Sequence, residues 1–483
     1  MANDRLINST QGESIISGLN TIATKLDALK TITAADNGKV VVNGALTEQT
    51  STSTTTNGTL DTTTNNSVVV NVANSYTQQD EGKVVSDGAL VAQTSATFTE
   101  NGTYDTTGIS SITINVSTVT AHTYGVVWDK TDPNHSSQLT YTDDSASFSR
   151  PDPFVNDGQH AGSSPFDALM PWSGMEKVTI DGNVLVKIPK FWFKWTSDAS
   201  SLKLQISDTA QEGFMVSPAH QARNANEQDR DFVYIGRYKC VNDTSDTTNN
   251  YKSQTGKSPM TNITRATART AIAGLGTGYS QQDFAMFWTV RMLYLVEFAD
   301  WNSQATIGNG CGNNSSAVST GSTDSMTYHT GTIQTDRTTY NGGTQYRWIE
   351  GLWDNVTEWC DGIFFAGTNK LDVYIIKNPA NFTDADTTNA VNVGQRANAS
   401  NCISDFFVPS TSGYEWALYP NAVSGSDYTK YVADRCYYNS SGVVLGIGGY
   451  YDRYQGYGMF YLSGSSDASY QNGSIGSRLQ YLP

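Results

Sequence analysis

Tyrosine accumulates in the C-terminal part of this 483-residue sequence, where 13 of the 26 tyrosines lie between Tyr414 and Tyr481, mixed with Ser, Gly and Asn. Tyrosine offers rigid contact area with a hydroxyl at its tip, and its small polar neighbours adapt their hydrogen bonds, so this composition is typical of a surface that binds another molecule. The chemistry it favours is noncovalent recognition. We assign to this contact surface Tyr437, Tyr438, Tyr450, Tyr451, Asp452, Arg453, Tyr454, Tyr457 and Tyr461.

An alternative is that these rings are half-buried strand residues, since aromatic side chains are favoured in sheets. The run at 450–454 lacks the two-residue alternation of a half-buried strand, which weakens this interpretation. Glycines flank the run at 448–449 and at 456 and 458 and permit tight backbone turns. The pattern predicts an exposed tyrosine turn between two framework strands.

Side chains that could bind a metal or act as nucleophiles are few and dispersed. The five cysteines form no CxxC pair, and the five histidines are far apart in the sequence. We therefore expect mostly free thiols and no zinc site. Segments rich in Asp and Asn at 242–246 and 384–386 could hold calcium, but neither has EF-hand spacing, so we expect solvated loops and no cofactor.

Charge and hydropathy exclude several classes of partner. The formal net charge is −16 and the basic residues are scattered, which disfavours nucleic acid and anionic membranes. The sequence contains no apolar run of about 18 residues and no apolar signal core at its start, so we expect no membrane insertion. The length predicts two to four domains.

Residues 1–33 are predicted to form a docking or coiled-coil helix. Thr10 and Glu13 have the spacing of a capping box. Apolar residues then follow at alternating intervals of four and three, namely Ile15, Leu19, Ile22, Leu26 and Leu29. This is a coiled-coil seam two heptads long, which favours an oligomer seam or a peg in a larger assembly. The alternative is one amphipathic helix packed on its own chain.

An internal duplication follows, with a constant spacing of 44 residues. Gly38 recurs as Gly82, and the motif at 57–63 recurs at 101–107. In each copy short Val, Thr and Ile runs bounded by Asn-Gly predict strands joined by tight turns. Because two copies are too few for a self-sufficient solenoid, we expect two small β repeat modules, 34–75 and 76–120, that extend a stalk.

The last domain is predicted over 121–483, with a C-terminal display region at about 434–483. Expected strands cover 184–195, 231–239, 347–353, 355–365, 371–377, 443–447, 459–462 and 477–482. Expected helices cover 262–273 and 280–299. The second has apolar residues on nearly every face, which predicts that it is buried.

Residues 346–361 (YRWIEGLWDNVTEWCD) resemble the Gly-Asn-Val-Trp-Glu-Trp signature of the formylglycine-generating-enzyme subfamily of the C-type lectin fold. Asn355, Val356, Glu358 and Trp359 match, whereas Asp354 and Thr357 depart from it, and the close at 476–479 is also similar. The resemblance implies an α+β chain, a C-type lectin head preceded by the short helix and the two β modules. It also implies structural roles for Trp348, Trp353, Asn355, Glu358, Trp359 and Arg478, with Glu358 bonded to backbone groups beneath the variable turns.

Two kinds of activity occur on that fold. The enzyme uses a closely spaced cysteine pair near its C-terminus, but here Cys436 is preceded only by Cys402, 34 residues earlier. We therefore expect no enzyme. The chain is more similar to phage tail-tip receptor-binding proteins, including those diversified by retroelements such as the major tropism determinant, which display binding residues in their C-terminal segment.

The resemblance thus implies a host-attachment adhesin in the virion, at the tail tip or on a fibre. The expected assembly is a homotrimer that contacts other virion tail proteins through its N-terminal region and a host cell-surface protein or glycan through its tyrosines. The alternatives are a virion decoration or bacterial surface protein with the same fold, and a formylglycine-generating-type oxidase.

Overall fold

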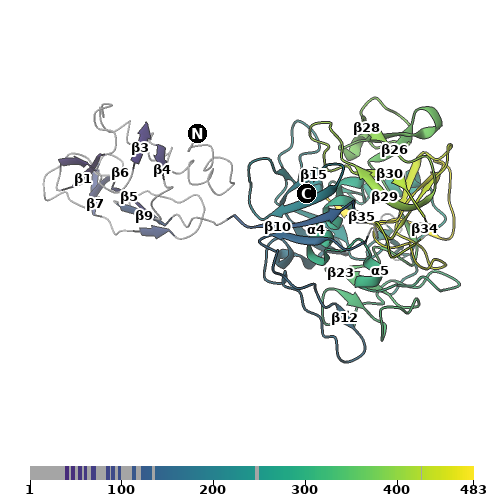
Figure 1. Cartoon of the computed structure of the whole chain (residues 1–483). Helices are drawn as coiled ribbons and strands as arrows, with labels where there is room; N and C mark the ends of the chain where they lie inside the picture. Colours follow the sequence, from purple (N-terminus) through teal and green to yellow (C-terminus); the bar gives the residue numbers. More distant parts are fainter. Residues whose placement is uncertain are drawn as a thin grey trace. The chain divides into compact units, whose positions relative to one another are not determined.

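The computed structural model describes residues 121–132, 136–244, 250–425 and 427–483, and the backbone of strands β1–β9 before them. The chain divides into two compact units (Figure 1): Met1–Ala121 with Thr209–Gln211, and His122–Asp208 with Glu212–Pro483. Strands make up 32 % and helices 11 % of the structure, which confirms a mixed α+β fold that is largely β. The helix expected at 1–33 lies outside the described residues.

The duplicated modules form equivalent strand pairs. β1 (Lys39–Val42) runs antiparallel to β2 (Ala45–Glu48), and 44 residues later β6 (Lys83–Ser86) runs antiparallel to β7 (Ala89–Ala92). β5 (Ser67–Asn71) pairs antiparallel with β9 (Ser111–Asn115) so that Val69 faces Thr113, its counterpart in the other copy. A local two-fold axis therefore relates the copies at this pair. The remaining strands are β3 (Ser53–Thr56), β4 (Thr59–Asp61) and β8 (Ala96–Phe98).

Three larger sheets build the second unit. One has the order β11 (Thr140–Asp143), β10 (Thr123–Asp129), β16 (Ser201–Ser207), β15 (Trp192–Ser197), β17 (Met215–Val216). Another has the order β13 (Glu176–Ile180), β14 (Asn183–Pro189), β18 (Phe232–Gly236), β35 (Leu479–Tyr481), β21 (Tyr279–Gln281). β35 lies inside this sheet, so the end of the chain is held on both edges.

The third sheet has seven strands and positions the display region. Its order is β30 (Tyr419–Val423), β29 (Asn401–Phe407), β31 (Arg435–Tyr438), β33 (Leu462–Ser466), β32 (Val444–Ile447), β25 (Thr357–Cys360), β34 (Ile475–Gly476). β25, from the segment that carries the resemblance, pairs with β32. The signature segment and the tyrosine-rich segment are therefore neighbours in one sheet.

Smaller sheets and turns complete the unit. One sheet has the order β12 (Phe154–Val155), β22 (Gly331–Thr332), β23 (Thr344–Tyr346), β24 (Ile349–Glu350). A second has the order β26 (Ile363–Ala366), β27 (Asp372–Ile375), β28 (Val391–Gln395), and β19 (Val241–Asn242) pairs with β20 (Tyr251–Lys252). The short 3-10 helices are η3 (Trp172–Gly174), η4 (Pro218–His220), η5 (Thr368–Lys370) and η6 (Pro379–Asn381).

Helix α4 (Phe284–Phe298) lies at the centre of the core, and all its residues are buried, which confirms the prediction of a buried helix. The helix was predicted to begin at Ser280 but begins at Phe284. The reason is that Asp283 is the N-cap, whose side chain accepts a hydrogen bond from the Met286 amide. The other α-helices described are α3 (Arg265–Ala273), capped by Thr264, and the short α5 (Ser303–Thr306).

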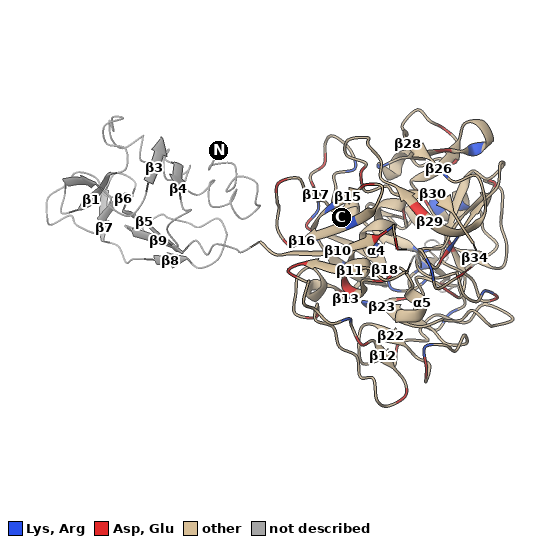
Figure 2. Cartoon of the chain, viewed as in Figure 1, with Lys and Arg blue, Asp and Glu red and all other residues tan. Residues whose placement is uncertain are grey.

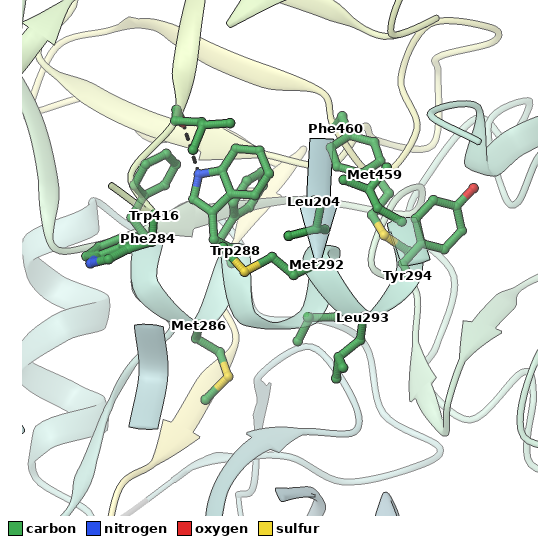
Figure 3. Packing of buried hydrophobic residues seen from close by; sticks show 14 of the residues in the cluster. Leu204, Phe284, Met286, Trp288, Met292, Leu293, Tyr294, Trp416, Met459 and Phe460 are labelled. Carbon is green, nitrogen blue, oxygen red and sulfur yellow. Dashed lines mark hydrogen bonds between the residues drawn. The ribbon is translucent and has the colours of Figure 1, made fainter. Parts of the chain in front are cut away.

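Helix α4 also supports the display region (Figure 3). The Trp288 indole donates to the Leu418 carbonyl at 3.0 Å, and the buried Arg291 donates through Nε to the Met459 carbonyl at 2.9 Å. The Phe460 ring lies 5.9 Å from the Tyr294 ring and is almost fully buried. Met459 and Phe460, in the middle of the display region, are therefore part of the main hydrophobic core.

Four predicted strands differ from the structure. The strand expected at 184–195 is divided between β14 and β15, and the strand expected at 355–365 between β25 and β26, and in both cases the two parts belong to different sheets. The strand expected at 459–462 begins only at Leu462, because Met459 and Phe460 lie in a turn. The strand expected at 347–353 is reduced to β24, because Arg347 and Trp348 have φ values of 45° and 70°, which break an extended chain.

Charged positions are sparse and mixed in sign through the second unit (Figure 2). All five cysteines are buried free thiols, in agreement with the sequence prediction. Among the described helices, none has the length and apolar character needed to cross a bilayer.

Candidate binding surface

Residues 448–461 form one loop between the antiparallel strands β32 and β33, which we call the tyrosine loop. Gly448 opens it with a φ of +65°, and a Cβ at this position would lie 2.7 Å from the Leu352 carbonyl oxygen. Only glycine fits this conformation and this close approach without strain. The loop therefore leaves the sheet in direct contact with the signature segment.

Asp434, just before β31, holds the C-terminal end of the loop. Its buried carboxylate accepts hydrogen bonds from the amides of Gly458 at 2.7 Å and Phe460 at 2.8 Å. Burial raises the pKa of Asp434 to about 7, although both hydrogen bonds oppose that rise. The Ser303 hydroxyl accepts the intervening amide, that of Met459, at 2.9 Å.

Gln304 of α5 holds the middle of the loop. Its side-chain oxygen accepts the Gly456 amide at 3.0 Å, and its nitrogen donates to the Tyr454 carbonyl at 3.2 Å. Gly456 has a φ of +82°. Four remote side chains, from Arg291, Ser303, Gln304 and Asp434, therefore fix the loop backbone.

The N-terminal half of the loop presents its side chains outward. Tyr454 is 52 % exposed and Asp452 is exposed, whereas Tyr450, Tyr451 and Arg453 are half-buried. The Tyr450 and Tyr451 rings stand edge to face, with centroids 5.7 Å apart. Tyr454 and Asp452 are therefore exposed as expected of a contact surface, whereas the other three side chains are only partly exposed.

Tyr457 and Tyr461 differ from that expectation, because they are only 9 % and 6 % exposed. Their rings pack 4.7 Å apart, and the Tyr457 hydroxyl bonds the Tyr437 hydroxyl at 2.6 Å. Burial raises the pKa of both phenols. The idea that these two rings face solvent is thus wrong, and they form a layer that supports the exposed residues.

Tyr437 and Tyr438, on β31, are half-buried. The Tyr437 ring contacts Tyr461 at 5.9 Å, and the Tyr438 hydroxyl donates to the Asn369 carbonyl at 3.0 Å. The Arg396 guanidinium lies 4.9 Å from the Tyr438 ring centroid. We call the exposed and half-buried set the tyrosine surface: Tyr437, Tyr438, Tyr450, Tyr451, Asp452, Arg453 and Tyr454.

A second loop borders the tyrosine surface and was missed by sequence reasoning. The Tyr454 hydroxyl donates to Asn313 Oδ1 at 2.6 Å, and the Asn314 amide donates to the Tyr451 carbonyl at 2.7 Å. The Tyr340 ring lies 5.1 Å from the Tyr454 ring. The asparagines within the glycine- and serine-rich stretch 308–340 were the only available signal, and spacing alone could not place them here.

The residues of the signature form the foundation beneath this surface. Glu358 on β25 is buried and accepts from Arg478 Nη2 at 2.7 Å and from Lys239 Nζ at 2.7 Å. These charges hold the pKa of the Glu358 carboxyl below its ordinary value against the effect of burial. The expectation that Glu358 bonds backbone groups is wrong: Arg478 reaches the carbonyls, including that of Gly236 at 2.7 Å, while Glu358 neutralises it.

The other signature residues also have structural contacts. The indoles of Trp353 and Trp359 donate to the Gly308 and Ile263 carbonyls, at 3.0 and 2.9 Å. Trp348 is half-buried beneath the Lys177 ammonium, 4.3 Å from its ring centroid.

Asn355 connects the foundation to the tyrosine loop. Its side chain bonds both the amide and the carbonyl of Val318, each at 2.9 Å, and its own carbonyl accepts the Tyr451 amide at 2.8 Å. Its φ of +55° suits asparagine better than most residues.

The side chains considered for metal binding or redox chemistry are paired with basic residues or buried in the structure. Asp384 is paired with Arg265 and Arg269, and Asp243 is paired with Lys257. No group of three or more candidate metal ligands occurs among the residues that the structure describes, and 245–249 lie outside them. Burial raises the pKa of the Cys436 thiol to about 12, so it is a poor nucleophile.

Scans against models of known protein families and against curated proteins give no match. The tyrosine surface and its supports are therefore the main guide to function.

Proposed function

We propose that the chain is a phage virion tail protein that attaches to a host cell-surface receptor through the tyrosine surface. The observation that supports this most is a contrast within one loop: its backbone is fixed by buried groups such as Asp434 and Gln304, while Tyr450, Tyr451 and Tyr454 reach solvent. A pre-ordered loop loses little entropy when it binds. Tyrosine and arginine are also the residues that most often dominate binding energy at protein interfaces.

The proposal includes a C-type lectin fold for the second unit, related to the formylglycine-generating-enzyme subfamily. Support comes from the Glu358–Arg478 pair, because it joins the two segments in which the sequence resembles that family, 346–361 and 476–479. The same pair braces β25, which lies beside β32 at the root of the tyrosine loop.

The proposed assembly is a homotrimer at the tail tip or on a fibre, with the N-terminal region contacting other virion tail proteins. Diversification by a retroelement would act on the tyrosine surface, where a change of side chain leaves the buried anchors intact. The DNA next to the gene tests this part: a near-identical repeat of the 434–483 coding region beside a reverse transcriptase gene is the expected arrangement.

The binding test replaces Tyr450, Tyr451 and Tyr454 together with alanine in the full chain. Binding of the labelled protein to host cells should fall at least about 100-fold, since each central aromatic residue contributes about 1 kcal/mol or more. The melting temperature should stay near that of the parent, because Tyr454 is 52 % exposed and Tyr450 and Tyr451 are only half-buried.

Phe232→Ala is the matched control, because Phe232 is an aromatic residue 40 % exposed on a different sheet, and its loss should leave cell binding unchanged. Retained binding by the triple tyrosine variant would remove the receptor assignment. Electron micrographs that place the protein away from the tail tip would favour a decoration protein instead.

A further inference from the structure

We propose that the receptor is a protein that presents carboxylate groups, and that Arg435 and Arg453 bind those groups at the tyrosine surface. This inference rests on the proposed function and names the chemistry of its partner. It follows from the way in which the arginines of the second unit are neutralised.

Most arginines in the described residues have a carboxylate within 4.0 Å. They are Arg150, Arg223, Arg230, Arg237, Arg265, Arg269, Arg337, Arg347 and Arg478. Four described arginines have none, namely Arg291, Arg396, Arg435 and Arg453. The chain has a net charge of −16, so acidic side chains outnumber basic ones. An arginine without an acidic partner is therefore unusual in this protein.

Two of the four donate to backbone carbonyls inside the protein, although Nη2 of Arg291 has no hydrogen-bond partner among the described residues. Arg291 is fully buried and donates to the Met459 carbonyl at 2.9 Å. Arg396 is also buried and donates to several carbonyls, including that of Gly464 at 2.7 Å. Both therefore serve to hold backbone, and neither is available to a ligand.

Arg453 is different. It is half-buried within the tyrosine loop, and its guanidinium lies near tyrosine rings instead of a carboxylate. Its guanidinium carbon lies 4.6 Å from the Tyr450 ring centroid and 5.5 Å from that of Tyr457. Stacking on a ring uses the face of the guanidinium and leaves N–H groups at its edge for a planar acceptor. A carboxylate accepts such a pair of N–H groups in a bidentate arrangement.

Arg435, on β31, also lies against a tyrosine ring. Its guanidinium lies 5.4 Å from the Tyr437 ring centroid, and Nη1 donates to the Tyr428 hydroxyl at 3.0 Å. Its Nε is buried and has no hydrogen-bond partner among the described residues. Tyr437 bonds Tyr457, so one layer of rings links the two guanidinium groups.

The acids near these arginines do not neutralise them. Asp452 is exposed and lies beyond ion-pairing distance of Arg453, while Asp434 is buried and points to the amides of Gly458 and Phe460. The surface therefore offers two arginines without acidic partners in a strongly acidic chain. An acidic partner would be attracted to these two arginines and repelled by the net negative charge of the rest of the chain. This difference favours docking with its acidic groups against the tyrosine surface.

The ring geometry favours a protein over a sugar chain. Tyr450 and Tyr451 meet at 76°, and Tyr340 and Tyr454 meet at 66°. Such rings give ridges and gaps instead of one flat platform for a sugar ring, and they suit interdigitation with side chains of a partner.

The test measures binding of the full chain to host cells at increasing NaCl. Arg453→Gln and Arg435→Gln should each weaken binding about tenfold or more and flatten its dependence on salt. Arg453→Lys should restore part of the salt dependence but less of the affinity, because lysine lacks the bidentate fork. Arg337→Gln is the matched control, since Arg337 is a half-exposed arginine already paired with Asp152, and it should bind like the parent.

Treatment of the cells identifies the partner class. Protease digestion of the cell surface should abolish binding, and periodate oxidation of its sugars should leave binding intact. The reverse result, or full binding by both glutamine variants while the tyrosine triple variant fails, overturns the inference and leaves the proposed function standing. Full binding by the tyrosine triple variant overturns the proposed function itself. If Arg435→Gln lowers the melting temperature, Arg453→Gln decides the question.

Discussion

Replacing Asp434 with asparagine tests how the tyrosine loop is held. The Asp434 carboxylate is 2 % exposed and accepts the amides of Gly458 and Phe460. Asparagine has nearly the same shape, but its nitrogen must face one of these two amides. A donor opposite a buried donor leaves that amide unsatisfied, which costs about 1–3 kcal/mol of unfolding free energy.

The pH dependence of the unfolding free energy separates the cost of the unsatisfied amide from the effect of the Asp434 charge. Burial raises the pKa of Asp434 in the folded protein to about 7, whereas in the unfolded chain a value of about 4 is expected. Between these values the unfolded state releases the proton while the folded state keeps it, so parental stability falls as pH rises, by about 4 kcal/mol in total. Asparagine does not titrate. The variant should therefore be less stable than the parent at about pH 4 and at least as stable at about pH 8.

Urea unfolding followed by tryptophan fluorescence measures this difference. All ten tryptophans follow residue 121, so the signal reports on the second unit. Asp452→Asn is the control, because it removes an exposed acid of the same loop and should leave the urea midpoint at a single pH unchanged. Stability curves for Asp434→Asn and the parent that run parallel from about pH 4 to about pH 8 would refute a buried carboxyl with a raised pKa.

Three further outcomes follow from the supports of the surface. Glu358→Gln leaves two buried cations without a counter-charge and should cost about 3–5 kcal/mol, seen as a lower melting temperature and a lower urea midpoint. Gly448→Ala should cost about 1–3 kcal/mol because of its positive φ and the nearby Leu352 carbonyl. Gly473→Ala should be nearly neutral in the same urea titration, because its Cβ would meet only the Asn262 side chain, at an ordinary contact distance of 3.9 Å. Addition of EDTA should leave the melting temperature unchanged, since carboxylates such as Asp384 are already paired with arginine; a drop would indicate a bound cation.

Several features could be read from the residues alone because they depend on local pattern. Apolar residues on nearly every face of 280–299 predicted a buried helix, and mostly free cysteines followed from their number and spacing. The constant spacing of 44 residues predicted two modules of the same kind, and their strand pairs are equivalent. The sequence also located the tyrosine-rich segment and the glycines that bound its turn.

The tertiary structure alone decided which tyrosines face solvent. Tyr454 and Tyr457 are three residues apart in one loop and identical in type, yet one is 52 % exposed and the other 9 %. Their difference arises from groups distant in sequence, since Gln304 fixes the backbone between them and Tyr437 bonds the second ring. Burial is a property of surrounding atoms, and in an irregular loop no periodicity links it to position in the chain.

The same reason explains the partners of Glu358 and of the arginines. Residue type determined that a buried carboxylate needs partners, but only the fold showed that they are Lys239 and Arg478. Likewise the number of charges follows from the residues alone, whereas the pairing that leaves Arg435 and Arg453 without a carboxylate arises from sheet order and loop path. Ion pairs act over a few ångströms, and long-range folding determines which groups come that close.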